Sequence, residues 1–207
     1  MKEKTYVEDI DRSMYEIHSD SKDYFRIEGG LNEDVIRQIS KEKNDPEWML
    51  DFRLRALKTY NELQIPDWGP SIDELNVDNI ITYITGTMRY LTVDKGDWSE
   101  VPQDIKDTFD RLGIPEAEKT SLAGVGAQFD SELVYHNIRK EIAAQGVIYS
   151  DVESALHGEY GDMIREHFMK LVTPRDHKFA ALHGAVWSGG SFVYVPKGVK
   201  LDIPLQS

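Results

Sequence analysis

The sequence predicts an α+β fold in which a mainly helical part is followed by strands of a larger buried sheet or solenoid. Helix start and stop signals recur between Asn32 and Pro174, with apolar residues at helical spacing between them. From Gly184 to Ser207 the composition changes to Val, Phe, Tyr, Ile, Leu, Gly and Pro, with few charged residues. Hydrophobic residues make up 40% of the chain and charged residues 29%, which is typical of a folded protein. We therefore divide the chain into a flexible arm at 1–30, a mainly helical domain at 31–178 and the incomplete start of a strand-rich core at 179–207.

The arm mixes charges with isolated aromatic residues and ends in two glycines, so little fixed structure is expected in residues 1–30. The first helix is predicted to begin after Asn32, whose side chain is a good N-cap. Glu33 and Asp34 then lie at the positive end of the helix dipole. A short apolar stripe follows at Val35, Ile36 and Ile39, so this helix is expected to be brief.

The second helix has the strongest start signal in the chain. Asp45 is predicted as its N-cap, Pro46 as its first helical residue and Glu47 as an acidic residue of the first turn. Ile65-Pro66 is predicted to close it. Its apolar residues cover more than one face, so it should pack on more than one neighbour: Trp48, Met49, Leu50, Phe52, Leu54, Ala56, Leu57, Tyr60 and Leu63.

The middle of the chain has weaker signals. Residues 67–100 show no helical period, although 77–91 is rich in Ile, Thr, Tyr and Val and is compatible with extended structure. A helix is predicted at 102–112, with Gly113 and Pro115 as its stop. A connector that contains Gly124 and Gly126 follows.

Short helices and one strand are expected between this connector and Pro174. A helix is predicted at 132–144, ended by Gly146, and a short strand at 147–149. Ser150 and Glu153 have the spacing of a capping box and should open another helix, which ends at Gly158. One more amphipathic helix is predicted from its apolar face at Met163, Ile164, His167, Phe168 and Leu171.

The C-terminal residues read as strands and turns. Gly189-Gly190 predicts a turn, 191–195 a strand that is apolar on both faces, 196–198 a second turn and 199–203 a second strand. Such strands need cover on both faces, as the rungs of a large sheet or a solenoid have. Residues 204–207 supply no cap, and an uncovered apolar edge promotes aggregation. We therefore expect the 207 residues to be part of a longer protein.

Charge and composition exclude several classes of function. Lys and Arg total 24 against 37 Asp and Glu, so the net charge is -13, and no Lys/Arg run favours nucleic acid or an anionic membrane. The absence of cysteine excludes a disulfide, a thiolate nucleophile and a Cys-ligated metal or cluster within these residues. No stretch approaches the roughly 20 apolar residues of a membrane span, and residues 1–20 lack the apolar core of a signal peptide. A cytoplasmic protein is the expectation.

Four histidines are the nearest approach to a metal site: His157, His167, His177 and His183. Their acidic neighbours are Glu153, Glu159, Asp162 and Glu166. The spacings do not fit the His-Glu-x-x-His arrangement of zinc hydrolases, so surface or packing roles are favoured for the histidines. Glu159 and Glu166 are interpreted as solvated helix faces and not as an acid-base pair.

Two other patterns also favour structural roles. Ser188-Gly189-Gly190-Ser191 is glycine-rich, but it precedes a strand and lacks the helix N-terminus of a phosphate loop, so a turn is favoured. Trp48, Phe52 and Tyr60 form an aromatic stripe at helical spacing, for which core packing is favoured over partner binding. The sequence therefore assigns no catalytic, cofactor-binding or metal residue.

Two long strings resemble the SufB family of iron-sulfur cluster assembly scaffolds. Residues 44–54 read NDPEWMLDFRL, which is similar to an N-terminal helix of that family. Residues 179–199 read FAALHGAVWSGGSFVYVPKGV, which resembles the start of the family's right-handed β-helix. Residues 109–115 and 145–148 fall in the expected order between them, so the resemblance covers about residues 20–207.

The resemblance implies a truncated right-handed β-helix at 179–207 and a scaffold role in a complex with the ATPase SufC and with SufD. In the family, the sulfur-accepting cysteine, the cluster ligands and the partner-binding segments follow the last residue of this chain. An iron-sulfur cluster is thus implied for the full-length protein, and no cofactor for these residues. Some relatives carry cysteines before the helix at 102–112, whereas Thr92–Lys95 and its surroundings have none, which puts a metal site there in doubt.

Three hypotheses of function remain at this stage. The first is a non-enzymatic scaffold subunit for iron-sulfur cluster assembly, with SufC, SufD and possible sulfur donor proteins as partners. The second is an acidic helical module whose role is protein binding. The third is a metal-dependent hydrolase that uses the histidines. The string at 179–199 favours the first.

Overall fold

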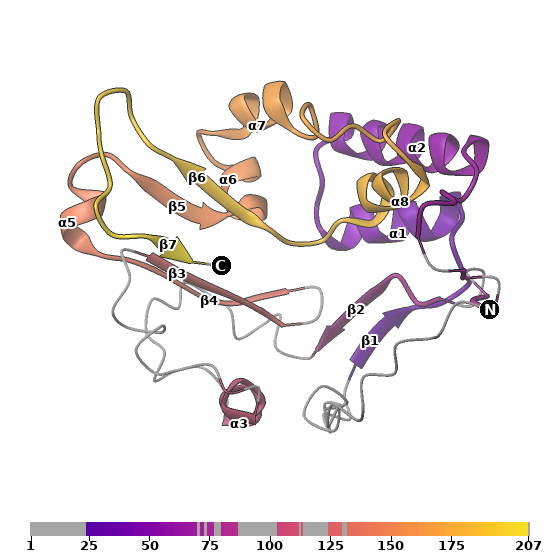
Figure 1. Cartoon of the computed structure of the whole chain (residues 1–207), viewed down its shortest axis with the longest axis horizontal. Helices are drawn as coiled ribbons and strands as arrows, with labels where there is room; N and C mark the ends of the chain where they lie inside the picture. Colours follow the sequence, from indigo (N-terminus) through magenta and orange to yellow (C-terminus); the bar gives the residue numbers. More distant parts are fainter. Residues whose placement is uncertain are drawn as a thin grey trace, which may run out of the picture.

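The computed structural model of the chain describes helices and three small sheets (Figure 1). The described residues are 24–69, 71–72, 74–76, 80–86, 103–111, 113, 124–129 and 132–206. Several predictions lie outside them, namely those for residues 1–23, 77–79, 87–102, 112 and 114–123. Among the described residues, no helix is both long and apolar enough to span a bilayer.

Helix α1 (Glu33–Glu42) begins where the sequence predicts. The Asn32 Oδ1 atom accepts a hydrogen bond from the backbone N–H of Val35 at 3.0 Å, which satisfies one donor of the first turn. The apolar stripe of α1 is buried and packs with Ile27 of strand β1 (Tyr24–Ile27). The expectation of little fixed structure is therefore wrong for residues 24–27.

Helix α2 (Glu47–Glu62) confirms the second helix, but its start is built differently. Asp45 is not the N-cap, because its carboxylate is taken by an ion pair in which Oδ2 lies 2.6 Å from Nε of Arg53. Pro46 holds the cap position without a side-chain hydrogen bond. The helix ends at Glu62 and not at Ile65-Pro66, since Leu63 already has an extended backbone.

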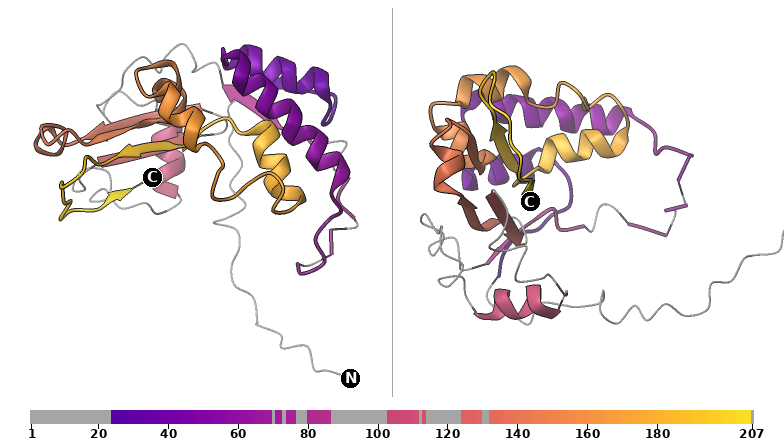
Figure 2. Two further views of the ribbon diagram at one scale, coloured as in Figure 1. Left: turned by 90° about the horizontal axis from the view of Figure 1, so that it is seen from above. Right: turned by 60° about the vertical axis from the view of Figure 1, so that its left-hand side comes forward.

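Helix α8 (Lys178–Val186) packs against α2, and α1 contacts both α2 and α8 (Figure 2). A Cβ atom on Gly184 would lie 3.1 Å from Cβ of Ala56, so glycine permits the close approach of the two helices. The sequence-based division assigns residues 179–207 to the strand-rich core, whereas this core begins with a helix that ends at Val186. Alanine has the highest helix propensity, and the three alanines of α8 favour the helix and are buried in it: Ala180, Ala181 and Ala185.

Further helices lie between α2 and α8 in the described part of the chain. Helix α3 (Gln103–Arg111) confirms the helix predicted at 102–112, and Gly113 follows it with a φ of 72°. Helix α6 (Val152–His157) ends at Gly158 as predicted. Its N-cap is Asp151 and not Ser150, because the Asp151 carboxylate accepts the N–H of Ser154 at 2.7 Å.

Helix α7 (Gly161–His167) is shorter than predicted. It stops at Phe168, whose backbone leaves the helical region, so Leu171 does not join the apolar face. Leu171 is instead 98% exposed. Residues 168–177 form an irregular segment that leads to α8.

The strands form three separate sheets. Strand β1 pairs antiparallel with β2 (Tyr83–Gly86), which lies within the stretch expected to be extended. Strand β3 (Gly124–Phe129) pairs antiparallel with β4 (Glu132–Ile138) and parallel with β7 (Leu205–Gln206). Strand β5 (Ile148–Asp151) pairs antiparallel with β6 (Ser191–Tyr194).

The β3–β4 pair overturns two predictions. Gly124 and Gly126 lie in a strand and not in a connector. The helix predicted at 132–144 is wrong over β4, and only α5 (Lys140–Ala143) is helical. Val134, Ile138 and Ile142 recur every fourth residue and imitate a helical stripe, but pairing with β3 decides the structure.

The C-terminal strand predictions are confirmed in part. Strand β6 lies within the predicted 191–195, and the turn at 196–198 is closed by a hydrogen bond from the Val199 N–H to the Pro196 carbonyl at 3.0 Å. Residues 199–203 do not form the second predicted strand; their apolar side chains pack on Ile142 and Val147 instead. The β-helix and the three-part division of the chain stay predictions.

Candidate functional site

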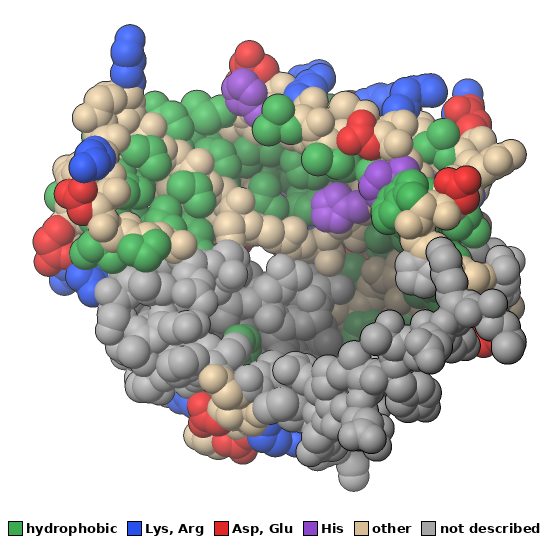
Figure 3. All heavy atoms as spheres, viewed as in Figure 1, with side chains coloured by type: hydrophobic (Ala, Val, Ile, Leu, Met, Phe, Trp, Pro, Cys, Tyr) green, Lys and Arg blue, Asp and Glu red, His purple; other side chains and the backbone are tan. Residues whose placement is uncertain are grey.

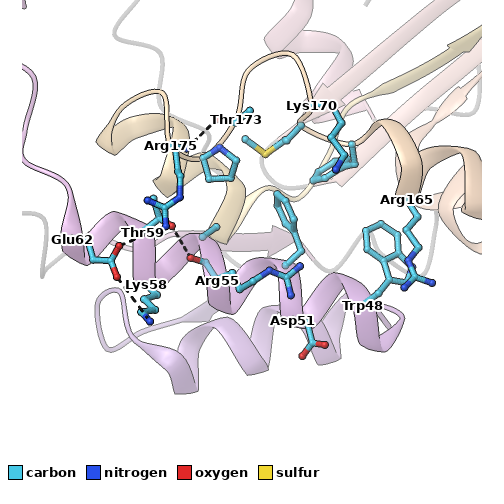
Figure 4. A pocket seen from close by; sticks show the side chains of 15 residues that line it. Trp48, Asp51, Arg55, Lys58, Thr59, Glu62, Arg165, Lys170, Thr173 and Arg175 are labelled. Atoms are coloured by element: carbon cyan, nitrogen blue, oxygen red, sulfur yellow. Dashed lines mark hydrogen bonds and ion pairs between the residues drawn. The ribbon is translucent and has the colours of Figure 1, made fainter.

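A groove of about 730 Å³ lies between α2 and the segment that runs from the end of α7 to residue 175 (Figure 4). We call it the α2 groove. The α2 wall is made of Trp48, Asp51, Phe52, Arg55, Ala56, Lys58, Thr59 and Glu62. The facing wall is made of Arg165, Phe168, Met169, Lys170, Thr173, Pro174 and Arg175.

The spacing of residues on α2 explains why one face of this helix forms a wall. Positions 48, 52, 55, 59 and 62 are three or four residues apart and therefore share a helix face. The aromatic rings of Phe52 and Phe168 meet edge to face with their centroids 5.2 Å apart, which joins the two walls at the floor. Phe168 also packs on Trp187, whose ring centroid lies 5.0 Å away.

Positive charge dominates the α2 groove. Five of its lining residues are Lys or Arg and two are Asp or Glu, although the whole chain carries a net charge of -13. Glu62 lies 4.0 Å from both Lys58 and Arg175, at one end of the groove (Figure 4). At the other end the Arg165 guanidinium lies 5.9 Å from the centroid of the Trp48 ring, a distance compatible with a cation–π contact.

A buried arginine supports the α2 groove from the opposite side of α2. The side chain of Arg53 is 0% exposed and that of its ion-pair partner Asp45 is 1% exposed. Arg53 also donates hydrogen bonds to the carbonyls of Ala185 at 3.2 Å and of Trp187 at 2.7 Å. These contacts hold α2 to the C-terminal end of α8 and so fix the position of the helix that forms the wall.

The aromatic stripe predicted on α2 divides between two environments. Tyr60 is buried, with Nζ of Lys178 at 4.0 Å from its ring centroid, as core packing predicts. Trp48 and Phe52 are half-buried and have both roles, because they pack against a hydrophobic cluster and also line the α2 groove. Core packing and a surface role are thus combined on a single helix.

The structure places His157 apart from the other three histidines. His157 Nε2 lies 3.3 Å from the carbonyl oxygen of Lys43, and His177 caps α8 by accepting the N–H of Ala180 at 3.2 Å. Three of them, His167, His177 and His183, line a second hollow of about 520 Å³. In the part of the chain that the structure describes, no three His, Asp or Glu side chains are placed to hold one metal ion.

The contacts of the acidic residues and of the glycine-rich segment are compatible with the structural roles that the sequence favours for them. Glu153 forms an ion pair with the buried Lys43 at 3.0 Å. Glu159 and Glu166 are exposed, as solvated positions are. The glycine-rich residues 188–191 connect α8 to β6, and the Gly190 carbonyl accepts the Val152 N–H at 3.0 Å.

Sequence reasoning missed the α2 groove and Arg53. The groove cations come from segments more than one hundred residues apart, so no run of Lys and Arg marks them. Arg53 lies between the apolar residues Phe52 and Leu54, but the sequence does not show that it faces the core, because its partner Asp45 fits the pattern of a helix cap.

Comparison with known proteins identifies the family. The family model described as "SufBD protein N-terminal region" matches residues 98–207. The chain is 48% identical over 199 residues to the iron-sulfur cluster assembly protein SufB of Bacillus subtilis. It is 50% and 49% identical, over the same length, to iron-sulfur cluster assembly SufBD family proteins of Staphylococcus haemolyticus and Staphylococcus aureus.

The matches cover nearly all of this chain but only part of each relative. Each alignment covers 96% of this chain and 42% of the relative, so the chain spans less than half the length of the proteins it resembles. The family model covers more than half of the chain, in the region that contains α3 to β7. The chain belongs to the SufBD family of iron-sulfur cluster assembly proteins, and its residues 98–207 match the N-terminal region of that family.

Proposed function

We propose that this chain forms the N-terminal part of a scaffold subunit for iron-sulfur cluster assembly, acting in a complex with SufC and SufD. The observation that carries the proposal is the 48% identity to SufB over 96% of the chain. Because the chain spans 42% of that relative, the activity of the whole protein belongs to the proposal and not to the match. The same role fits the cytoplasmic location that the sequence leads us to expect.

Within such a scaffold, we assign this part a positioning role and no catalytic one. The chain contains no cysteine, so its residues supply neither thiolate ligands for a cluster nor an acceptor for persulfide sulfur. Its contribution is then a folded surface that holds partners or the rest of the subunit in place.

We also propose that β6 leads into the β-helix that the sequence resemblance implies. Strand β6 pairs with β5 along one edge, and its other edge has no partner strand among the described residues. Val193 is 46% and Val195 is 39% exposed, and hydrophobic side chains gather on this side of the molecule (Figure 3, upper left). Further strands on this edge would cover these side chains, which supports the proposal.

A chimeric protein tests the function. In a Bacillus subtilis strain depleted of its own SufB, the 199-residue matched segment of SufB is replaced by this chain. We expect the chimera to restore the activity of a cluster-dependent enzyme such as aconitase and to co-purify with SufC and SufD. Intact SufB is the positive control, and SufB without the segment is the negative control.

The same experiment separates the scaffold role from the alternative of an acidic interaction module unrelated to cluster assembly. A chimera that accumulates to the level of SufB, yet restores no enzyme activity and retains neither partner, would contradict the proposal. If enzyme activity is restored but SufC and SufD do not co-purify, the proposed complex is contradicted and the proposed role in cluster assembly is not.

A further inference from the structure

We propose that the α2 groove binds an acidic peptide segment of a partner protein, one that carries large apolar side chains among its carboxylates. The proposal goes beyond the scaffold role because it names a binding surface and the chemistry of its ligand. It is carried by the charge, the apolar floor and the dimensions of the groove.

The charge of the groove selects an anionic ligand. The groove has a net charge of plus three in a chain of net charge -13. Among the described residues, Arg55 and Lys170 line the groove without any carboxylate within ion-pair distance. Both side chains belong to exposed residues, so their positive charges face an incoming ligand.

The floor of the groove selects apolar side chains on that ligand. Phe52, Phe168, Met169 and Pro174 are half-buried, so each leaves part of its surface open between the cations. Trp48 closes one end beneath Arg165. Aromatic residues and arginine are the side chains that most often dominate the binding energy of protein interfaces. A ligand with carboxylates alone would leave this apolar floor in water.

The dimensions fit a short stretch of peptide. The α2 wall runs from Trp48 to Glu62, which corresponds to about 21 Å at the helical rise of 1.5 Å per residue. An extended peptide covers that length with about six residues, since each residue adds about 3.3 Å. The cations are distributed along the whole length: Arg165 at one end, Arg55 in the middle and Arg175 at the other end (Figure 4).

A polypeptide is favoured over a nucleic acid as the source of the negative charge. Asp51 and Glu62 lie on the α2 wall and would repel a continuous phosphate backbone, whereas a peptide places carboxylates and neutral residues alternately. The overall charge of -13 also opposes a long polyanion, which would extend past the groove. A short acidic peptide meets only the local positive field.

Fluorescence anisotropy with a labelled peptide tests the proposal. The probe is a labelled peptide of about eight residues, in which two Phe are placed among Asp and Glu residues. It is titrated with the full 207-residue chain. We expect saturable binding that weakens at least about fivefold when the salt concentration rises from about 0.05 to 0.5 M, because exposed charges are screened. Replacing Phe by Ser, or Asp and Glu by Lys, should weaken binding at least about tenfold.

A charge-reversal variant locates the site. R55E/K170E should weaken peptide binding at least about tenfold, whereas K197E/K200E should leave it within about twofold. The control makes the same change of net charge at exposed residues outside the groove, on the segment after β6. Circular dichroism and thermal melting verify that each variant is folded. If R55E/K170E does not fold, R55Q/K170Q replaces it, with an expected loss of at least about fivefold.

The remaining outcomes overturn the proposal. Equal loss of binding in the groove variant and the control would show that net charge alone attracts the peptide. Unchanged binding in the groove variant would place the peptide elsewhere, and the absence of saturable binding would exclude the ligand. Tighter binding of a labelled single-stranded oligonucleotide than of the acidic peptide would assign the groove to nucleic acid.

Discussion

Replacing the buried Arg53 by methionine should strongly destabilise the chain. Arg53 donates to the carboxylate of Asp45 at 2.6 Å and to the carbonyls of Ala185 and Trp187. Arg53→Met removes all three hydrogen bonds and leaves a carboxylate that is 1% exposed without its counter-charge. The loss of stability therefore comes chiefly from the unpaired Asp45 carboxylate and not from the removal of the Arg53 guanidinium itself.

The magnitude follows from the burial of the pair. Breaking a buried ion pair by removing one partner costs about 3–5 kcal/mol, because the other charge stays in a medium that solvates it poorly. The two carbonyls lose their donor as well, but these costs overlap, and the methionine side chain recovers some apolar packing. We expect a loss of about 4 kcal/mol in the free energy of unfolding. For a chain of this length that corresponds to a fall in Tm of about 8–16 °C.

Urea unfolding followed by circular dichroism measures the loss. Arg37→Met is the matched control, because the Arg37–Glu33 pair has exposed side chains 3.6 Å apart and should contribute about 0.5 kcal/mol or less. Asp45→Asn should cost little in the Arg53→Met background, since it neutralises the stranded carboxylate. A loss below about 1 kcal/mol for Arg53→Met would refute the reasoning.

Three further predictions follow from other features. Gly184→Val should destabilise the chain by about 2 kcal/mol, because a side chain at this position is forced against Ala56. The control Gly69→Val places its side chain in open space and should change stability by less than about 0.5 kcal/mol. Denaturant unfolding measures both changes. Desolvation by burial, together with the hydrogen bond and charge of Glu159, raises the pKa of Tyr160 above its usual value of 10.0. The stability that depends on its proton is therefore present below pH 10 and decreases as pH rises through the raised pKa. Urea unfolding of the chain and of Tyr160→Phe at a series of alkaline pH values measures this decrease, which should be smaller in the variant. After anaerobic incubation with iron and sulfide and desalting, the chain should retain no cluster, because it has no cysteine; stoichiometric iron and sulfide would contradict that expectation.

The parts of the fold that the sequence predicts are those fixed by local interactions. Asn32 caps α1 through a hydrogen bond three residues away, and Gly158 ends α6, so short segments contain the whole signal. Strand β4 shows the limit. Its residues repeat at a helical spacing, and only the neighbouring strand β3, with which they pair, makes them extended.

The candidate site was less predictable because it is made by contacts between distant segments. The sequence shows Trp48 and Phe52 as part of an aromatic stripe, but the residues that face them across the groove lie beyond residue 160. The overall negative charge conceals a positive groove, since composition averages over all surfaces. The sequence neighbours of Asp45 fit a helix cap, whereas the partner of its carboxylate, Arg53, is eight residues away in the chain.

The contact between α2 and α8 has a consequence for synthesis of the protein on the ribosome. Nζ of Lys178 donates hydrogen bonds to the carbonyls of Tyr60 at 2.7 Å and Leu63 at 2.9 Å, so the C-terminal end of α2 is completed by a residue made 115 positions later. At translation rates of about 5–20 residues per second, Lys178 is synthesised roughly 6–23 s after the C-terminal end of α2. During that interval the part of α2 that α8 later covers is exposed in the nascent chain, and a chaperone can bind it.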